Sequence, residues 1–390
     1  MDRTLEGVSL TACSRARGFR GCLAGLALGT ALWLLAGTAG GLEVRETELF
    51  AALDRFHAGD RSGALDALDR VTDSYPNFRA ARLIKSSLHE TNDLRATLID
   101  LTPRAVFSLL EDPTDEAYSR LSYWFERPPP GHLPAVLIDA APDRTKAMVA
   151  DTAHSRLYLF DWTEDGWTMQ GDWYASVGRG GSAKRREGDL KTPLGVYFVT
   201  MWVAGRYLPD LYGAGALGLN YPNEWDRRRQ RDGFGIWIHG EPRGVKSRPP
   251  RWSQGCLVVS NPALENLVEE IEEQSIPVII GDGLRWLAPN DHEIRREEWR
   301  ARIASLNDGN QGNGGLGIYG YPVSPGKEFS MVLAEFRTGP KDTGRWWQYW
   351  REHRDGVWRI AHEGQASFDE IHLQGLPPRM PPAGVDLYNP

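Results

Sequence analysis

Cys256 is the residue of this sequence best suited to covalent chemistry, and it lies in the run Arg251-Trp252-Ser253-Gln254-Gly255-Cys256. A thiol attacks a carbonyl as its thiolate, and an unperturbed thiol, with a pKa of about 8.5, is only slightly ionised near neutral pH. A nucleophilic cysteine therefore needs a base beside it. Of the nine histidines, His154 and His239 lie clearly within the β-rich middle of the chain.

His239 is the base that we expect to pair with Cys256. It ends an apolar run and is followed by glycine, whereas His154 lies in a polar turn. Ser253 and Gly255 are small enough to let a substrate backbone approach Cys256. The backbone N–H groups of Gly255 and Cys256 are then candidates to stabilise a developing oxyanion. Considered singly, the thiol and the histidine would each be explained more simply as buried structural groups.

The start of the chain predicts export. A region with an excess of arginine precedes an uncharged stretch over residues 21–42, which ends in small residues near Ala39. This order is typical of a signal peptide, and residues 21–42 are also long enough to remain as an anchor across a hydrocarbon core of roughly 30 Å. Both outcomes place the rest of the chain in the periplasm or cell envelope. Because Cys13 and Cys22 belong to residues 1–42, Cys256 is the one cysteine left after cleavage.

Composition argues against several functions. A formal net charge of −7 over 390 residues argues against a nucleic-acid partner. Because no paired-histidine pattern of zinc-ligand type is present, we expect no metal and no cofactor. The glycine runs at 213–218 and 312–317 have the Gly-x-Gly-x-x-Gly spacing, but neither follows a clear strand and opens a helix. The run at 178–184 misses the P-loop spacing, and we interpret it as a mobile loop near an acceptor groove.

The periodicity predicts an α+β protein with three parts after residues 1–42. Residues 43–95 have helical spacing broken at Ala58-Gly59-Asp60, which predicts a helical hairpin resembling one tetratricopeptide-like repeat. Its role is packing, dimerisation or holding a partner. Residues 96–133 end in prolines and are predicted to be a linker. Residues 134–288 alternate with period two, which predicts a mostly antiparallel β domain, with a helix at 262–274 and a closing strand at 276–280.

The C-terminal part is predicted to be a small separate domain over residues 293–366. A charged helix at 293–306 precedes strands at 329–336, 346–353 and 357–363, which favours a curved antiparallel sheet filled by tryptophans. The end of this sheet, Gly356 to Gly364, resembles an NTF2-like module. Residues 367–390 are interpreted as a tail.

Three separated motifs together resemble a known family. They are Gly188-Asp189-Leu190-Lys191-Thr192-Pro193-Leu194-Gly195-Val196-Tyr197, then Gly235-Ile236-Trp237-Ile238-His239-Gly240, then Ser253-Gln254-Gly255-Cys256-Leu257-Val258-Val259 followed by Asn261. Their order and spacing resemble the L,D-transpeptidase catalytic domain of the YkuD type over about residues 134–287. The runs 221–226 and 247–251 resemble a murein L,D-transpeptidase subgroup, and the C-terminal module resembles that of cell-shape L,D-carboxypeptidases.

This resemblance implies a cysteine acyl transfer on peptidoglycan stem tetrapeptides. Cys256 would form a thioester with release of D-alanine and pass the acyl group to an amine, while His239 would move the proton. With water as acceptor, the enzyme would be an L,D-carboxypeptidase or a lipoprotein-releasing amidase. The alternative from another class is an inactive peptidoglycan-binding protein. The implied partners are stem peptides, together with a lipoprotein or a second copy bound through the helical unit.

One position departs from the family. Many members carry histidine where this chain has Gln254, and glutamine cannot act as a base, although it can donate a hydrogen bond to a substrate carbonyl. The further candidates for substrate binding are Ser253, Gln254, Arg248, Arg251 and Tyr221. The two arginines are candidates to bind stem carboxylates.

Overall fold

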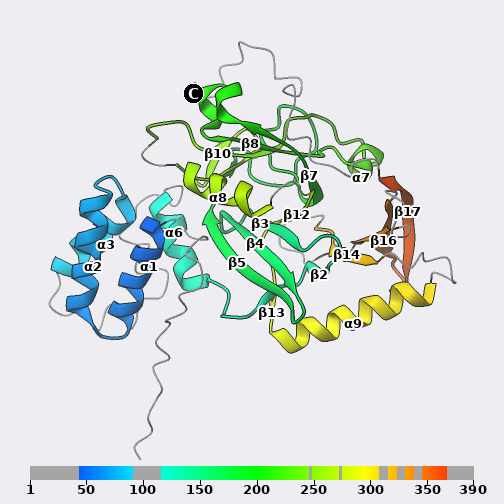
Figure 1. Ribbon diagram of the computed structural model, residues 1–390, viewed down its shortest axis with the longest axis horizontal. Helices are drawn as coiled ribbons and strands as arrows, with labels where there is room; N and C mark the ends of the chain where they lie inside the picture. Colours follow the sequence, from blue (N-terminus) through cyan, green and yellow to red (C-terminus); the bar gives the residue numbers. More distant parts are fainter. Residues whose placement is uncertain are drawn as a thin grey trace, which may run out of the picture. The chain divides into compact units, whose positions relative to one another are not determined.

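Residues 44–90, 116–245, 248–271, 275–306, 315–322, 329, 331–337 and 345–366 are described by the computed structural model. They all belong to one unit, Ala39–Pro390. They have the predicted α+β fold, with N-terminal helices, a curled central sheet and a C-terminal antiparallel sheet (Figure 1). The predicted signal or anchor and the predicted tail lie outside the described residues.

The N-terminal helices follow the predicted pattern. They are α1 (Val44–His57), α2 (Arg61–Ser74) and α3 (Arg79–Glu90). Leu49 and Leu53 are buried at the expected helical spacing. Gly59 lies between α1 and α2 with a φ of 88°, a backbone conformation that glycine adopts without strain. The side chain of Asp60 then accepts a hydrogen bond from the N–H of Gly63 and caps α2.

Helix α6 (Glu116–Glu126) lies in the range predicted as a linker. Its inward face carries Ala117 and Leu121, but also the buried charges Glu116 and Arg120, which pair with each other at 2.7 Å. Charged residues on the buried face obscure the apolar period by which an amphipathic helix is recognised. The helix is therefore recognised only when the partners of its charged residues are known.

The central sheet has eight strands in the order β11-β9-β8-β7-β12-β3-β4-β5. Most neighbours are antiparallel, as predicted, while β12 and β3 are parallel and so are β11 and β9. The strand bounds are β3 (Lys146–Asp151), β4 (Arg156–Thr163), β5 (Gly166–Tyr174), β7 (Gly195–Ala204), β8 (Gly215–Leu219), β9 (Trp237–His239), β11 (Leu257–Val258) and β12 (Pro277–Gly281). Helices α7 (Glu224–Arg228) and α8 (Asn261–Ile271) follow β8 and β11, and the second one matches the predicted helix.

The sheet curls so that its two edges meet. Ser176, just after β5, forms an antiparallel bridge with Val258 of β11 at the opposite edge. Next to this bridge, the short strands β6 (Val177–Gly178) and β10 (Arg251–Ser253) pair in parallel. The chain that leads to Cys256 therefore runs beside the segment that follows β5.

The C-terminal sheet has five strands in the order β17-β16-β15-β14-β2. Its bounds are β2 (Leu137–Asp139), β14 (Leu316–Gly320), β15 (Met331–Arg337), β16 (Arg345–Glu352) and β17 (Trp358–Ala366). The strand predicted at 136–139 thus joins this sheet, not the central one. Helix α9 (Pro289–Leu306) packs Trp299 and Ile303 against the sheet residues Ile318 and Trp350. A further pair, β1 (Leu133–Pro134) with β13 (Trp286–Leu287), lies beside the central sheet.

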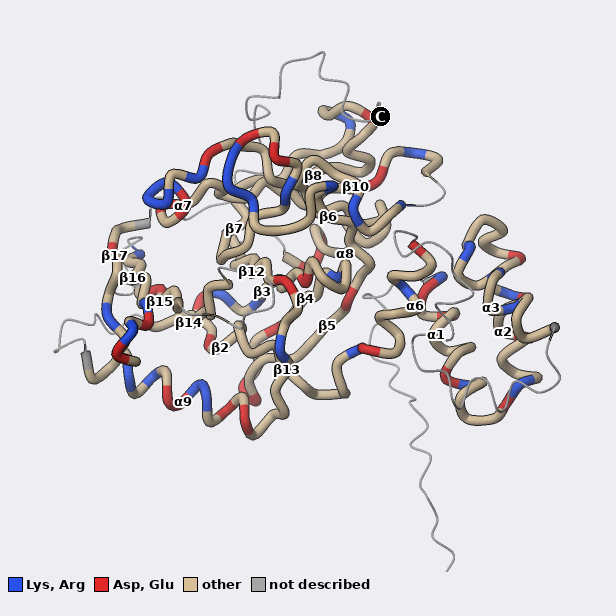
Figure 2. The backbone as a smooth tube through the Cα atoms, turned by 180° about the vertical axis from the view of Figure 1, so that it is seen from behind, with Lys and Arg blue, Asp and Glu red and all other residues tan. Residues whose placement is uncertain are grey.

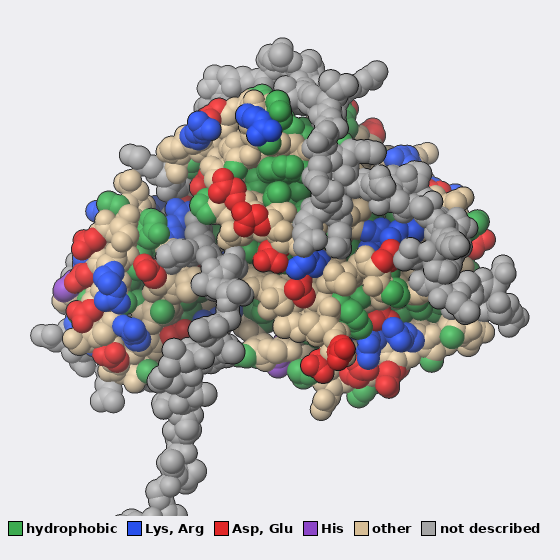
Figure 3. All heavy atoms as spheres, in the orientation of Figure 1, with side chains coloured by type: hydrophobic (Ala, Val, Ile, Leu, Met, Phe, Trp, Pro, Cys, Tyr) green, Lys and Arg blue, Asp and Glu red, His purple; other side chains and the backbone are tan. Residues whose placement is uncertain are grey.

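Charges of both signs are mixed over the surface. Basic and acidic residues alternate along α9 (Figure 2) and are interspersed on the face drawn in Figure 3. Within the described ranges, no helix combines the length and apolar character needed to cross a membrane.

Candidate active site

Two adjacent parallel strands place His239 and Cys256 on one face of the sheet. Val258 of β11 is the register partner of His239 on β9, and Cys256 precedes β11. Side chains alternate along a strand, so residues two apart share a face. Cys256 accordingly packs with Trp237, on the face of His239, while Ile238 and Leu257 point into the core on the other side. The fold thus brings the two predicted catalytic residues to the same face.

His239 is buried, with 2% of its surface exposed, and its tautomer is fixed. Its Nδ1 lies 2.7 Å from the carbonyl oxygen of Gly240. A carbonyl oxygen only accepts, so Nδ1 carries the proton and Nε2 keeps its lone pair. The ring of Tyr212 packs edge-on against the imidazole at 5.0 Å. Burial lowers the pKa of His239 to about 4, and the positive charge of Arg248 acts in the same direction, so the imidazole is neutral at pH 7.

Cys256 is half-buried, and its Sγ lies 3.4 Å from the carbonyl oxygen of Gly235. Burial raises the pKa of the Cys256 thiol to about 11, although a backbone hydrogen bond from Trp237 and the charge of Lys184 act in the opposite direction. The resting pair is therefore a neutral thiol and a neutral imidazole. Among the described residues, Nε2 of His239 has no hydrogen-bond partner, and the proton moves only when the thiol attacks.

Ser253 shapes the turn that presents Cys256. Its Oγ donates to the carbonyl oxygen of Cys256 at 2.6 Å and accepts from the N–H of Gly255 at 3.0 Å. Gly255 has a φ of 130°, and a Cβ there would lie 2.7 Å from the carbonyl oxygen of Lys191. Of the two predicted oxyanion donors, the Gly255 N–H is thus engaged within the turn. The Cys256 N–H has no acceptor in the described part of the chain.

Asn261 holds the backbone that follows His239. Its Oδ1 accepts from the N–H of Ala214 at 2.7 Å, and its Nδ2 donates to the carbonyl oxygen of Glu241 at 2.9 Å. A Cβ on Gly240 would lie 2.2 Å from Asn261 Oδ1, and one on Gly213 would lie 2.1 Å from it. The glycine run at 213–218 therefore serves as a close-packed turn beside the site.

The loop at 178–192 adds positive charge near the thiol. Lys184 is 3% exposed, and its Nζ donates to Asp189 at 2.9 Å and to the carbonyl oxygen of Arg186 at 3.0 Å. Thr192 Oγ1 accepts from the N–H of Gly178 at 2.9 Å and ties the ends of the loop together. The run at 178–184 is predicted to be a loop near the acceptor groove. It forms part of the 178–192 loop, which packs beside Gly255.

Arg248 is buried, with 1% of its surface exposed. Its Nη1 donates to the carbonyl oxygen of Val258 at 2.8 Å, and its guanidinium lies over the ring of Tyr174. Its backbone N–H donates to Glu116 of α6 at 2.7 Å. Arg248 is therefore part of the interior of the fold. Its guanidinium binds β11, the strand that follows Cys256.

The remaining predicted substrate contacts occupy different environments. Arg251 is exposed at the start of β10, and Gln254 is half-buried beside Cys256. Tyr221 is 5% exposed, and its hydroxyl donates to the carbonyl oxygen of Asp232 at 2.9 Å. Tyr221 thus lies beneath the site, in the same apolar cluster as Ile236.

His154 lies apart from this pair, in the turn between β3 and β4. Its Nδ1 is 2.9 Å from Asp151 and its Nε2 is 3.1 Å from Glu126 of α6. Both of its ring nitrogens thus face carboxylates. Among the described residues, no group of three or more His, Cys, Asp or Glu side chains is arranged to hold a metal ion.

Sequence reasoning did not assign three residues that build the site. Tyr212 packs on His239, Glu116 holds the backbone of Arg248, and Lys184 acts on the thiol. Tyr212 directly precedes the glycine run at 213–218, which was the one available signal for it. Glu116 carried no such signal, because its partner is 132 residues away.

Comparison with known proteins identifies the segment that contains this site. Residues 145–280 match the YkuD family, the L,D-transpeptidase catalytic domain. This part of the chain is therefore similar to an L,D-transpeptidase catalytic domain. It includes the strands of His239 and Cys256 and the 178–192 loop. No curated protein matches the sequence.

Two solved structures resemble parts of the chain. One is Bd1075 from Bdellovibrio bacteriovorus, with 21% identity and a TM-score of 0.48, covering 61% of this chain and 100% of that one. The other is the helical cell shape determining protein Pgp2 from Campylobacter jejuni, with 18% identity and a TM-score of 0.44, covering 59% of this chain and 95% of that one.

Proposed function

We propose that this protein is a peptidoglycan L,D-transpeptidase-type cysteine acyl transferase that acts on stem tetrapeptides. The observation that carries the proposal is the orientation of His239. Its Nδ1 is tied to Gly240, which leaves Nε2 to act as the base, and Cys256 lies on the same face of the sheet. The domain family, whose members act on peptidoglycan stem peptides, supplies the substrate class.

The first half-reaction forms a thioester. Cys256 Sγ attacks the carbonyl carbon of the third stem residue while His239 Nε2 takes the thiol proton. Because both groups are neutral at rest, proton transfer accompanies the attack. The N–H of Cys256 stabilises the oxyanion. The N–H of Gly255 becomes a second donor to the oxyanion when it leaves its hydrogen bond to Ser253 Oγ. The tetrahedral intermediate then expels D-alanine, whose amine takes the proton from His239.

The second half-reaction returns the enzyme to its resting state. An acceptor amine attacks the thioester carbonyl, and His239 takes the proton that the amine loses. The Cys256 thiolate leaves and is reprotonated by His239. With a stem amine as acceptor the product is a crosslink, and with water it is a tripeptide. Where the leaving amine of the first half-reaction is a lipoprotein lysine instead of D-alanine, thioester formation releases the lipoprotein and water then hydrolyses the thioester.

The test combines intact-protein mass measurement with D-alanine assay after incubation with a stem tetrapeptide. We expect a tripeptidyl adduct on the wild-type chain, and neither adduct nor D-alanine with Cys256→Ala. His239→Gln should slow adduct formation by about 100-fold or more, in line with the usual contribution of a positioned base. The matched control is Cys13→Ser with Cys22→Ser, which should keep full activity.

Two results would contradict the proposal. One is a wild-type protein that binds tetrapeptide without releasing D-alanine, which is the behaviour of an inactive peptidoglycan-binding protein. The other is D-alanine release that survives Cys256→Ala. Among active outcomes, muropeptide dimers indicate a transpeptidase, tripeptides an L,D-carboxypeptidase, and released lipoprotein an amidase.

We also propose that the enzyme works in the periplasm or cell envelope, where its substrate is found. Residues 1–42 would direct export or act as an anchor. The C-terminal sheet with α9 would be an NTF2-like module, as in the cell-shape L,D-carboxypeptidase subgroup. The side chains of Trp347 and Trp350 are buried and serve packing, whereas Trp346 of the same strand is exposed.

A further inference from the structure

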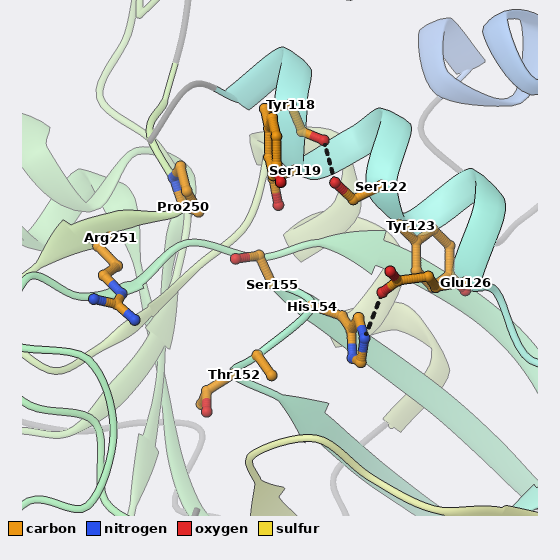
Figure 4. Close-up of a pocket in the computed structure, with 11 residues that line it drawn as sticks. Tyr118, Ser119, Ser122, Tyr123, Glu126, Thr152, His154, Ser155, Pro250 and Arg251 are labelled. Carbon is orange, nitrogen blue, oxygen red and sulfur yellow. Dashed lines mark hydrogen bonds and ion pairs between the residues drawn. The ribbon is translucent and has the colours of Figure 1, made fainter. Parts of the chain in front are cut away.

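A cavity of about 460 Å³ lies between helix α6 and the catalytic domain (Figure 4). It has three walls: α6, the turn between β3 and β4, and the residues that begin β10. The groups that matter for binding are Tyr118, Ser119, Ser122, His154, Ser155 and Arg251. None of them takes part in the reaction proposed for Cys256 and His239.

Ser155 is an unusual residue on this wall. It is 2% exposed, and its φ of 53° is a left-handed conformation that is uncommon for a residue other than glycine. Its carbonyl oxygen accepts from the N–H of Ala175 at 2.8 Å. Its hydroxyl, in contrast, has no hydrogen-bond partner among the residues described, and it points toward the side of the pocket where Arg251 lies (Figure 4). A hydroxyl that lines a pocket without a partner in the described part of the chain is available to a ligand.

Arg251 supplies a positive charge on the opposite side of the pocket. Its side chain is exposed and has no carboxylate partner in the described ranges. A Cβ on Gly181 would lie 3.8 Å from the guanidinium carbon, so this group lies beside the 178–192 loop. Within the described ranges the guanidinium has no counter-ion.

The acidic groups of the pocket are already paired. Glu126 and Asp151 both contact His154, at 3.1 Å and 2.9 Å. The hydrogen bond to Asp151 and the charge of Glu126 raise the pKa of His154 above its ordinary value. Both carboxylates are thus held by His154, and Arg251 remains as the charge open to a ligand. The ligand that fits is an anion with hydrogen-bonding groups.

The pocket is within reach of the nucleophile. Ala175 bonds to Ser155, and the next residue, Ser176, bridges Val258 of β11. Arg251 precedes Cys256 by five residues, so their Cα atoms are at most about 18 Å apart. A stem of four residues extends about 14 Å. The separation between the nucleophile and the pocket is therefore of the order of the length of one stem peptide.

We propose that this pocket binds a carboxylate of a peptidoglycan stem peptide, which pairs with Arg251 while the hydroxyls of Ser155 and Ser119 bond to its amide groups. The inference rests on the proposed function, because that function supplies the class of ligand. Two stems meet at such an enzyme, the donor that acylates Cys256 and the acceptor that removes the acyl group. Both carry free carboxylates, and the experiment distinguishes them.

The test measures binding in a Cys256→Ala background, where no chemistry occurs. The probe is the tripeptide L-Ala-D-Glu-diamino acid, and calorimetry gives its Kd. We expect Arg251→Ala to weaken binding about tenfold or more, because it removes a charge-assisted hydrogen bond. Ser155→Gly should weaken it a few-fold, since glycine keeps the left-handed backbone and removes only the hydroxyl. The control is Arg354→Ala, an exposed arginine of the C-terminal sheet, which should bind as well as the parent.

A second probe tests the chemistry of recognition. The same tripeptide with its carboxylates amidated should bind more weakly to the parent, and Arg251→Ala should then cause no further loss. If Arg251→Ala leaves the Kd of the carboxylate form unchanged, the proposal is overturned. Should this variant fail to fold, Ser119→Phe fills the pocket from α6, and unchanged binding by that variant also overturns it.

Turnover assays with Cys256 present assign the stem and separate this proposal from the previous one. A donor carboxylate in the pocket predicts that Arg251→Ala raises KM for D-alanine release. An acceptor carboxylate predicts normal D-alanine release with a slower transfer to amine. If the wild-type chain releases no D-alanine, the proposed acyl transfer is refuted. The proposed binding at Arg251 is not affected by that result, because tripeptide binding is measured independently.

Discussion

The backbone N–H of Arg248 donates a 2.7 Å hydrogen bond to Oε2 of Glu116, and this contact joins helix α6 to the loop between His239 and Cys256. The guanidinium of Arg248 continues the connection to the carbonyl oxygen of Val258, the register partner of His239. Glu116 also pairs with Arg120 at 2.7 Å. Helix α6 thus holds the loop from which Cys256 is presented.

The first prediction concerns Glu116→Gln. The change keeps an acceptor for the Arg248 N–H but removes the charge that pairs with Arg120, which retains Glu46 at 2.9 Å. Removal of one partner of a buried ion pair is expected to lower the free energy of unfolding by about 3 kcal/mol, measured by urea titration. Thioester formation should slow at temperatures where the variant is still folded.

The control is Glu126→Gln, at the exposed end of α6, which should lower the free energy of unfolding by less than about 1 kcal/mol. A destabilised variant with an unchanged acylation rate would show that α6 does not position the loop.

The second prediction concerns the reactivity of the free enzyme. Because burial raises the pKa of the Cys256 thiol to about 11, the rate of alkylation by iodoacetamide should increase about tenfold per pH unit from 7 to 9. The rate for N-acetylcysteine should instead level off near its ordinary pKa of about 8.5. Peptide mapping by mass spectrometry separates Cys256 from Cys13 and Cys22. A plateau near pH 7 would indicate a preformed thiolate and imidazolium, contrary to the neutral pair inferred here.

The sequence identified Cys256 and His239 because their residue types and spacing are local features of short runs. It also predicted the class of the fold, since alternation and helical spacing are local as well. The strand at 136–139 shows the limit of this reasoning. Its apolar pattern indicates a strand, but its partner in the C-terminal sheet is Ile318 and neighbouring residues, far along the chain. A period of two specifies that a strand exists and not which sheet it joins.

Charged residues show the same limit in the site. Arg248 and Arg251 are identical in type and close in sequence, so both were candidates to bind stem carboxylates. In the fold, Arg248 is buried against carbonyl oxygens and Glu116, whereas Arg251 is exposed at a pocket. The difference is set by α6, whose packing depends on buried charge pairs that leave no apolar period in the sequence.

The third prediction concerns acid pH. Burial lowers the pKa of His239 from its ordinary value of 6.5 to about 4, so the acid limb of kcat/KM for D-alanine release should lie near pH 4. In the unfolded chain the same group takes up a proton near 6.5, so folding is disfavoured progressively as pH falls from 6.5 toward 4. His239→Gln removes this effect.

Unfolding in urea at two pH values checks the sign. Between pH 7 and pH 5, wild type should lose about 2 kcal/mol relative to His239→Gln. His57→Gln, at an exposed position of α1, should not change the loss seen in wild type. An equal loss in wild type and His239→Gln would mean that His239 titrates as an ordinary histidine.

The last prediction concerns Gly240→Ala and its dependence on Asn261. A Cβ on residue 240 would lie 2.2 Å from Asn261 Oδ1, so the backbone there must shift. The carbonyl oxygen of Gly240 is the group that fixes Nδ1 of His239, and the shift should lower the rate of thioester formation by about 10–100-fold, as expected when a supporting contact of a catalytic group is disturbed. Asn261→Ala removes the obstructing atom along with its bonds to Ala214 and Glu241. In that background Gly240→Ala should cost less than it does in wild type, since the two residues act through one contact. Single-turnover rates for the four proteins form a double-mutant cycle, and additive losses would mean that Gly240 acts on His239 without Asn261.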